Sequence, residues 1–211
     1  MSAAAVVLLR PAAGSPTDWS PLATSLGRGG SVITPDLGLR PDRPVILEGP
    51  ALNALAAITA AGLDTAALCG LGFGAMTALS VAAGFGARVS AVVLSTARTP
   101  ESTALLSLHH GWQGLLSAST AQRLGASATQ VAQLFDQVRP TDYRAWVARV
   151  EVPALVLVGD RDVANLGPST KLAAALPHGR LQIVAHAGAD WPRTQPDRYA
   201  ELVWTYLSTG G

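Results

Sequence analysis

Four polar side chains follow closely on apolar runs of the chain, where they could take part in chemistry. Asp162 and His186 come after two such runs, and Arg10 and Ser95 end two others. Carboxylates and imidazoles can transfer protons, a guanidinium binds carboxylates, and a hydroxyl can contact a ligand. If these runs are neighbouring parallel strands, their carboxyl ends meet at one edge of a sheet, and we expect all four side chains there.

Three glycines, Gly70, Gly72 and Gly74, stand between an apolar run at 66–69 and a helical pattern at 75–83. This spacing predicts a tight strand-to-helix turn, because glycine tolerates a strained backbone and lets a strand and a helix approach closely. A helix beginning after Gly72 would direct main-chain N–H groups and the positive end of its dipole toward a bound ligand.

The apolar runs that must position these groups alternate with helical patterns. The predicted strands are 4–9, 31–34, 66–69, 89–94, 154–158 and 181–185, and the predicted helices are 17–26, 50–61, 75–83, one that includes 172–176, and 198–207. Strands separated by helices pair in parallel through right-handed crossovers, and runs without polar alternation are typical of strands covered on both faces. The fold class is therefore α/β, with a doubly wound, mostly parallel sheet of about six strands.

One segment, residues 96–149, breaks this alternation. It contains helical patches, including a glutamine-rich helix at 128–138, but no convincing strand. We expect a single domain over 1–211, with 96–149 inserted as a small helical cap over the ligand edge. His109 and Trp112 lie in this cap and either line a pocket or belong to a plain helix surface.

The strand–turn–helix around Gly72 resembles the nucleophile elbow of the α/β-hydrolase family, in which Gly-x-Ser-x-Gly carries the nucleophilic serine. Other segments are similar to the same family in the same order: 8–14 followed by Asp18-Trp19 to its first loop, 32–37 to its second parallel strand, 152–162 to the strand that delivers the triad acid, and 188–196 to the segment of the triad histidine. By this resemblance Asp162 holds the acid position, Gly72 the serine position and Asp190 the histidine position.

Gly72 and Asp190 depart from the serine and histidine of the family pattern, and these two departures decide the expected chemistry. Serine hydrolysis needs a hydroxyl nucleophile, an imidazole to take its proton and a carboxylate to orient the imidazole. Gly72 has no side chain to acylate, and loss of a single triad member costs about 10⁴–10⁶ in rate. We therefore do not expect an ordinary serine hydrolase.

The resemblance also implies that the backbone part of the machinery survives. In the family, two main-chain N–H groups form an oxyanion hole, and here they would belong to Phe73 and Ala12. Arg10 stands where the family commonly has histidine, and it either clamps a substrate carboxylate or is an exposed loop residue. Gly72 leaves room for a bulkier ligand because it lacks a side chain.

Asp162 and Asp190 are the predicted catalytic residues. If they converge, repulsion between the two carboxylates raises one pKa and creates a general acid. Alternatively, Asp162 caps the following segment or pairs with Arg161, and Asp190 is a surface-loop residue.

Ser95, His186 and Trp191 complete the predicted substrate-binding residues. Ser95 ends a strand at the ligand edge, His186 is a candidate replacement base, and Trp191 either packs in the core or stacks on a ligand. Cys69, the sole cysteine, falls within a predicted strand, where we expect a buried, inert thiol.

A rival motif runs through the same glycines. Gly70-x-Gly72-x-x-Ala75 after a strand satisfies a dinucleotide-binding fingerprint, and Arg98 after the next strand would suit a 2′-phosphate. The similarity around Asp162 and Trp191 has no place in that interpretation, so we favour the hydrolase-like one.

Composition limits the partners. Of the 211 residues 49% are hydrophobic and 14% charged, with a net charge of +1, which gives no electrostatic case for nucleic acid or an anionic membrane. One cysteine excludes an internal disulfide, no apolar run approaches ~20 residues, and the first nine residues lack the positive start of a signal peptide. We expect a cytoplasmic protein without cofactor or metal that binds a small molecule, and a homodimer is left open.

Three functions remain open. The first is a non-hydrolytic enzyme that cyclises, isomerises or eliminates from a small molecule, for instance in secondary metabolism, through an oxyanion-hole-like pocket. The second is an inactive pseudo-hydrolase that binds a ligand or serves in assembly. The third is a residual hydrolase in which Asp162, Asp190 or His186 activates water.

Overall fold

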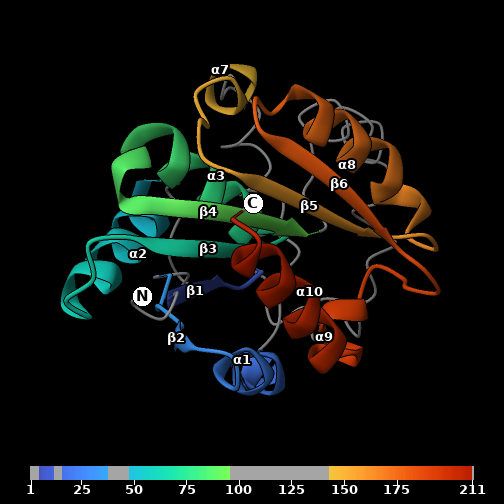
Figure 1. Ribbon diagram of the computed structural model, residues 1–211, viewed down its shortest axis with the longest axis horizontal. Helices are drawn as coiled ribbons and strands as arrows, with labels where there is room; N and C mark the ends of the chain where they lie inside the picture. The colour runs from blue at the N-terminus through green and yellow to red at the C-terminus, as the bar shows by residue number, and fades with distance from the viewer. Residues whose placement is uncertain (1–4, 12–15, 38–47, 96–142, 211) are drawn as a thin grey trace, which may run out of the picture.

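A computed structural model describes residues 5–11, 16–37, 48–95 and 143–210 of the chain. Within these residues six strands form one sheet in the order β2-β1-β3-β4-β5-β6, and every neighbouring pair is parallel (Figure 1). The strands are β1 (Ala5–Leu9), β2 (Ser31–Ile33), β3 (Ala66–Leu71), β4 (Val89–Ser95), β5 (Ala154–Gly159) and β6 (Gly179–Val184). The predicted α/β class and parallel sheet are confirmed.

Helices cover both faces of this sheet. One face carries α1 (Ser20–Gly27) with the short 3-10 helix η1 (Pro16–Trp19) before it, α9 (Trp191–Thr194) and α10 (Pro196–Ser208). The other face carries α2 (Glu48–Ala60), α3 (Phe73–Phe85), α7 (Tyr143–Val147) and α8 (Val163–Ala175), and the 3-10 helix η2 (Gly86–Arg88) links α3 to β4. This two-sided cover explains why the strands read as continuous apolar runs.

The core therefore consists of two clusters, one on each face of the sheet. Along β3, Leu68 belongs to the cluster beneath α3 and α8, whereas its neighbour Cys69 belongs to the cluster beneath α1 and α10. Every residue of β1, β3 and β5 is buried, while the two edge strands β2 and β6 are partly exposed. Successive side chains of a strand point to opposite faces, so both alternating sets must be apolar here.

The junction between β3 and α3 is tighter than the glycine pattern predicted. Gly70 and Leu71 pair with Leu94 and Ser95 of β4, which extends β3 beyond the predicted end at residue 69. Helix α3 then begins at Phe73, two residues before the predicted start at 75. The turn consequently consists of Gly72 alone.

Other predicted boundaries differ from the observed ones by a few residues. The predicted helix that includes 172–176 is α8, which begins at Val163, contains Pro168 and ends at Ala175. Strand β6 ends at Val184 rather than at Ala185, and His186, two residues after Val184, has a φ of 57°. A strand cannot continue through a left-handed residue.

Most of the predicted cap, residues 96–142, lies outside the described residues. Of the same segment, α7 packs against α3 and α8 and leads into β5. Among the described helices, none is long and apolar enough to cross a membrane.

Candidate functional site

The parallel sheet gathers the predicted site residues at one edge. Arg10 follows β1, Gly72 follows β3, and Ser95 is the last residue of β4. The chain passes from β1 to β2 on one side and returns to β3 on the other, so the topological switch point lies between the carboxyl ends of β1 and β3. Ligands of doubly wound sheets bind at such a point, which here places Arg10 and Gly72 on either side of the expected crevice.

Gly72 has a backbone conformation that suits glycine. Its φ of 55° and ψ of −111° lie in a region that residues with a Cβ rarely adopt. Its N–H donates to the carbonyl oxygen of Ser95 at 2.9 Å, and its own carbonyl oxygen accepts from the N–H of Ala75 at 3.1 Å. The sharp strand-to-helix turn predicted from the glycines is therefore present, and these two hydrogen bonds hold it from both sides.

The flanking glycines are required by packing. A Cβ on Gly74 would lie 1.8 Å from the carbonyl oxygen of Leu9, and a Cβ on Gly70 would lie 2.5 Å from the Cα of Ala75. Both obstacles are backbone atoms, which cannot move aside as the end of a flexible side chain can. The first turn of α3 is thus pressed directly against the end of β1.

The first N–H groups of α3 face the same edge without an intrahelical acceptor. Phe73 and Gly74 begin the helix, and neither main-chain N–H makes a hydrogen bond to a described residue. Such free donors at a helix N-terminus attract negative or partly negative oxygen atoms. Ala12, the second predicted oxyanion donor, lies outside the described residues.

Arg10 is partly buried beside this turn. Its carbonyl oxygen lies 2.9 Å from the position that a Cβ of Gly74 would occupy, so its main chain touches the start of α3. Within the described part of the chain its guanidinium forms no hydrogen bond or ion pair. An arginine whose main chain touches the start of α3 suits a carboxylate ligand of the free N–H donors there.

Asp162 is held by its own helix. The carboxylate is only 4% exposed, and Asn165 Nδ2 donates to both of its oxygens at 2.8 and 2.7 Å. Asp162 precedes the first residue of α8, although its side chain makes no capping hydrogen bond. The alternative pairing with Arg161 is wrong, because the Arg161 guanidinium lies 3.2 Å from His186 Nδ1 instead.

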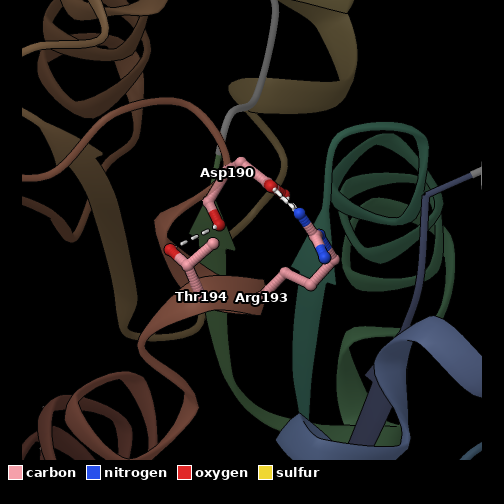
Figure 2. Close-up of polar contacts among 3 residues, drawn as sticks. All are labelled: Asp190, Arg193 and Thr194. Atoms are coloured by element: carbon pink, nitrogen blue, oxygen red, sulfur yellow. Dashed lines mark hydrogen bonds and ion pairs between the residues drawn. The ribbon is translucent and has the colours of Figure 1, made fainter. Parts of the chain in front are cut away.

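Asp190 has a different local partner (Figure 2). Its carboxylate accepts from Arg193 Nε at 3.0 Å and forms an ion pair with Arg193 Nη2, and the Thr194 hydroxyl donates to its main-chain oxygen at 3.2 Å. The Asp190 side chain is 54% exposed. Among the described contacts, none joins Asp190 to Asp162, so the structure adds nothing to the hypothesis of a shared proton.

The remaining predicted residues have contrasting surroundings. Exposed His186 follows β6 and contacts Arg161. Trp191 is 1% exposed and packs its ring against that of Tyr199, with a centroid distance of 5.2 Å. Trp191 is therefore a core residue, as one of its two interpretations held. His109 and Trp112 lie outside the described residues.

The buried side of the site contains a residue that the sequence did not single out. Tyr199 of α10 is fully buried, and the Ser95 hydroxyl donates to its hydroxyl at 3.2 Å. Burial raises the pKa of the Tyr199 phenol well above its usual range, and the nearby Cys69 thiol adds to the rise. Cys69 is buried, as predicted, and this burial raises the pKa of its thiol.

The described residues contain no group of three His, Cys, Asp or Glu side chains that could hold a metal ion. What this edge offers is main-chain donors, one partly buried cation and two carboxylates that already have partners. This arrangement can bind an anionic or carbonyl oxygen.

No protein-family model and no curated protein matches the chain, but many solved structures share its fold. The enol-lactonase from Burkholderia xenovorans is 20% identical, with a TM-score of 0.75, over 99% of this chain and 92% of the other. The protein has the α/β-hydrolase fold. A malate-bound esterase from Thermogutta terrifontis has a TM-score of 0.76 at 20% identity, over 99% and 91% of the two chains.

A third neighbour of this α/β-hydrolase-fold protein was solved with small carboxylates. It is a serine-to-alanine mutant of a meta-cleavage product hydrolase from Pseudomonas fluorescens, complexed with acetates, with a TM-score of 0.73 at 15% identity over 100% and 92% of the two chains. These neighbours are described as hydrolases or esterases, and none supports a non-hydrolytic activity. Identities this low establish the shared fold alone.

Proposed function

We propose that this chain is a non-hydrolytic protein of the α/β-hydrolase fold that binds a small molecule through a carboxylate or carbonyl oxygen, without forming an acyl-enzyme. The observation that carries the proposal is the turn at Gly72. Its positive φ and the free N–H groups of Phe73 and Gly74 match what the family uses to stabilise an oxyanion, yet the turn bears no nucleophile.

Arg10 supports a carboxylate as the ligand group. Its side chain has no partner within the described residues, and its main chain touches the first turn of α3. Together with the helix N-terminus it would place positive charge on two sides of a bound anion. The malate and acetates bound to two neighbours of the fold are ligands of this class.

The two carboxylates favour binding over turnover. Asp162 is hydrogen-bonded through both oxygens to Asn165, and Asp190 is paired with Arg193. A general acid or base must reach the proton it transfers, and a carboxylate held by a neighbour on its own helix is poorly placed to do so. We therefore place a ligand-binding pseudo-hydrolase first.

A second candidate is an enzyme that cyclises, isomerises or eliminates from its substrate. The burial of Asp162 at the carboxyl edge favours it, because a carboxylate shielded from water is the kind of group that acid–base catalysis uses. In that case Asp162→Asn would abolish turnover of the substrate and leave binding intact.

The proposal is tested by titrating the ¹⁵N-labelled protein with acetate and following the amide signals of Phe73 and Gly74. We expect saturable shifts with a roughly millimolar Kd, as befits a ligand of so few atoms. Arg10→Ala should weaken binding about five- to tenfold. The matched control is Arg149→Ala, which removes one positive charge from the exposed turn after α7 and should leave the Kd unchanged.

Covalent chemistry is tested separately. The wild-type protein should resist a serine-directed fluorophosphonate and should not hydrolyse p-nitrophenyl acetate above background. Gly72→Ser combined with Asp190→His should gain fluorophosphonate labelling, because the two substitutions restore a serine and a histidine at the positions that the family resemblance assigns to them. Labelling of the wild type, or ester turnover lost in Asp162→Asn, would replace the proposal with a residual hydrolase.

A further inference from the structure

The turn at Gly72 is hydrogen-bonded to Ser95, the last residue of β4. Leu71 lies opposite Ser95 in the sheet, and the Gly72 N–H continues this pairing by donating to the Ser95 carbonyl oxygen at 2.9 Å. This hydrogen bond fixes the peptide plane immediately before the N–H groups of Phe73 and Gly74. The direction in which those donors point thus depends on where the end of β4 lies.

The same residue is tied to the opposite layer of the molecule by its side chain. The Ser95 hydroxyl is fully buried and donates to the Tyr199 hydroxyl of α10 at 3.2 Å. Tyr199 is itself fully buried, and its ring packs on Trp191, the residue after Asp190. Buried hydroxyls need such partners, so breaking this contact removes a hydrogen bond of the Tyr199 hydroxyl inside the core.

From this geometry we infer that Tyr199 is a positioning residue, which acts through Ser95 to set the orientation of the main-chain donors at the Gly72 turn. This inference rests on the proposed function for its ligand, a carboxylate. The main-chain donors of Phe73 and Gly74 are then held by a chain of buried contacts, which runs from α10 through the end of β4 to the start of α3.

Helix α10 provides a matched control. Tyr206 lies seven positions along the same helix and in the same core cluster, but its buried hydroxyl has no hydrogen-bond partner within the described residues. Tyr199→Phe and Tyr206→Phe therefore remove the same atom from the same helix, and only the first removes a contact with the strand that holds the turn.

The test records amide signals of the ¹⁵N-labelled, ligand-free variants and then titrates each with acetate. Tyr199→Phe should move the Gly72, Phe73 and Gly74 amide signals and weaken acetate binding roughly three- to tenfold. Tyr206→Phe should leave these signals and the acetate Kd as in the wild type. Ser95→Ala breaks the same contact from the other side, and the double variant Ser95→Ala/Tyr199→Phe should move the signals no further than Ser95→Ala alone.

The inference is overturned if Tyr199→Phe leaves the turn amides as unperturbed as Tyr206→Phe does, or if Ser95→Ala and Tyr199→Phe act additively. A fall in melting temperature without movement of those signals also overturns it, because Tyr199 would then only stabilise the core. Failure of the wild type to bind acetate would remove the proposed function but not the positioning role, which the ligand-free spectra decide by themselves.

Discussion

Two regions of the carboxyl edge show different kinds of structural constraint. The turn from Gly70 to Gly74 is fixed by backbone packing and by hydrogen bonds to another strand. In contrast, Asp162 and Asp190 are held by residues only three positions further along the chain, Asn165 and Arg193. The first region depends on long-range structure, and the second on local side-chain contacts.

The geometry of the turn therefore depends on contacts other than those that hold Asp162 and Asp190. The main-chain geometry at Gly72 is fixed by hydrogen bonds to β4 and within α3, and its φ of 55° suits a glycine. The side chains of Asp162 and Asp190 make their described hydrogen bonds with Asn165 and Arg193 and none with Gly72. Three predictions test this contrast, first at the packed backbone, then at the two carboxylates and last at an exposed ion pair.

The largest effect is expected in the backbone region, from Gly74→Ala. The new Cβ would lie 1.8 Å from the Leu9 carbonyl oxygen, so β1 and α3 would have to separate. We expect a loss of about 3 kcal/mol or more in the free energy of unfolding, measured by urea denaturation. Gly84→Ala, in the same helix with nothing within 4 Å of its Cβ, is the control and should gain roughly 0.5–1 kcal/mol. Similar effects for the two variants would contradict the described contact between β1 and α3.

An intermediate effect is expected for Asp162→Ala. It leaves the amide of Asn165, which is 5% exposed, without its carboxylate, so unfolding should become easier by about 1–3 kcal/mol. Asp190→Ala removes an exposed ion pair and should cost at most about 1 kcal/mol. Denaturation of both variants in the same buffer is the measurement. An equal or larger cost for Asp190→Ala would show that its contact with Arg193 is more than a local surface pair.

The smallest effect concerns Asp197 of α10, which lies away from the site. A hydrogen bond from the Ser25 hydroxyl, followed by the charge of Arg28, lowers the pKa of Asp197 below its usual 3.8. A carboxyl whose pKa is lower in the folded state stabilises that state above pH ~4 and loses this contribution as pH falls through the folded pKa.

Asp197→Asn should therefore lower the melting temperature slightly at pH 7, and the difference from the wild type should shrink below pH ~4. Thermal unfolding at several pH values measures this, with Asp190→Ala as a comparison in a second exposed pair. A difference that grows as the pH falls would contradict the assigned contacts of Asp197.

Much of the fold could be predicted from the sequence. The apolar runs located all six strands of the described sheet, because burial on both faces leaves little room for polar residues. The glycines marked the turn after β3, since only glycine fits the close contact of Gly74 with Leu9. In contrast, the start of α8 was not predicted, because its first half is partly exposed and lacks the apolar spacing of a buried helix.

The partners of the site residues could not be predicted in the same way. The Asn165 and Arg193 contacts are local, but sequence spacing does not distinguish a carboxylate aimed at its own helix from one aimed at a ligand. Tyr199 was missed because it is 104 positions from Ser95, and no local pattern connects them. In the sequence, Tyr199 lies within an apolar helical pattern and is not distinguished from an ordinary core residue.

The sequence by itself determined the six strands of an α/β protein, the place of the sharp turn and the absence of a nucleophile at Gly72. These features depend on hydrophobicity, on backbone freedom and on the presence or absence of a side chain, all of which are properties of single residues or short runs. Only the tertiary structure decided that Arg10 lies beside α3, that Asp162 faces Asn165 and that Ser95 reaches Tyr199. Contacts between distant residues depend on how helices pack on the sheet, and this packing is the sum of many side-chain fits that no short segment contains.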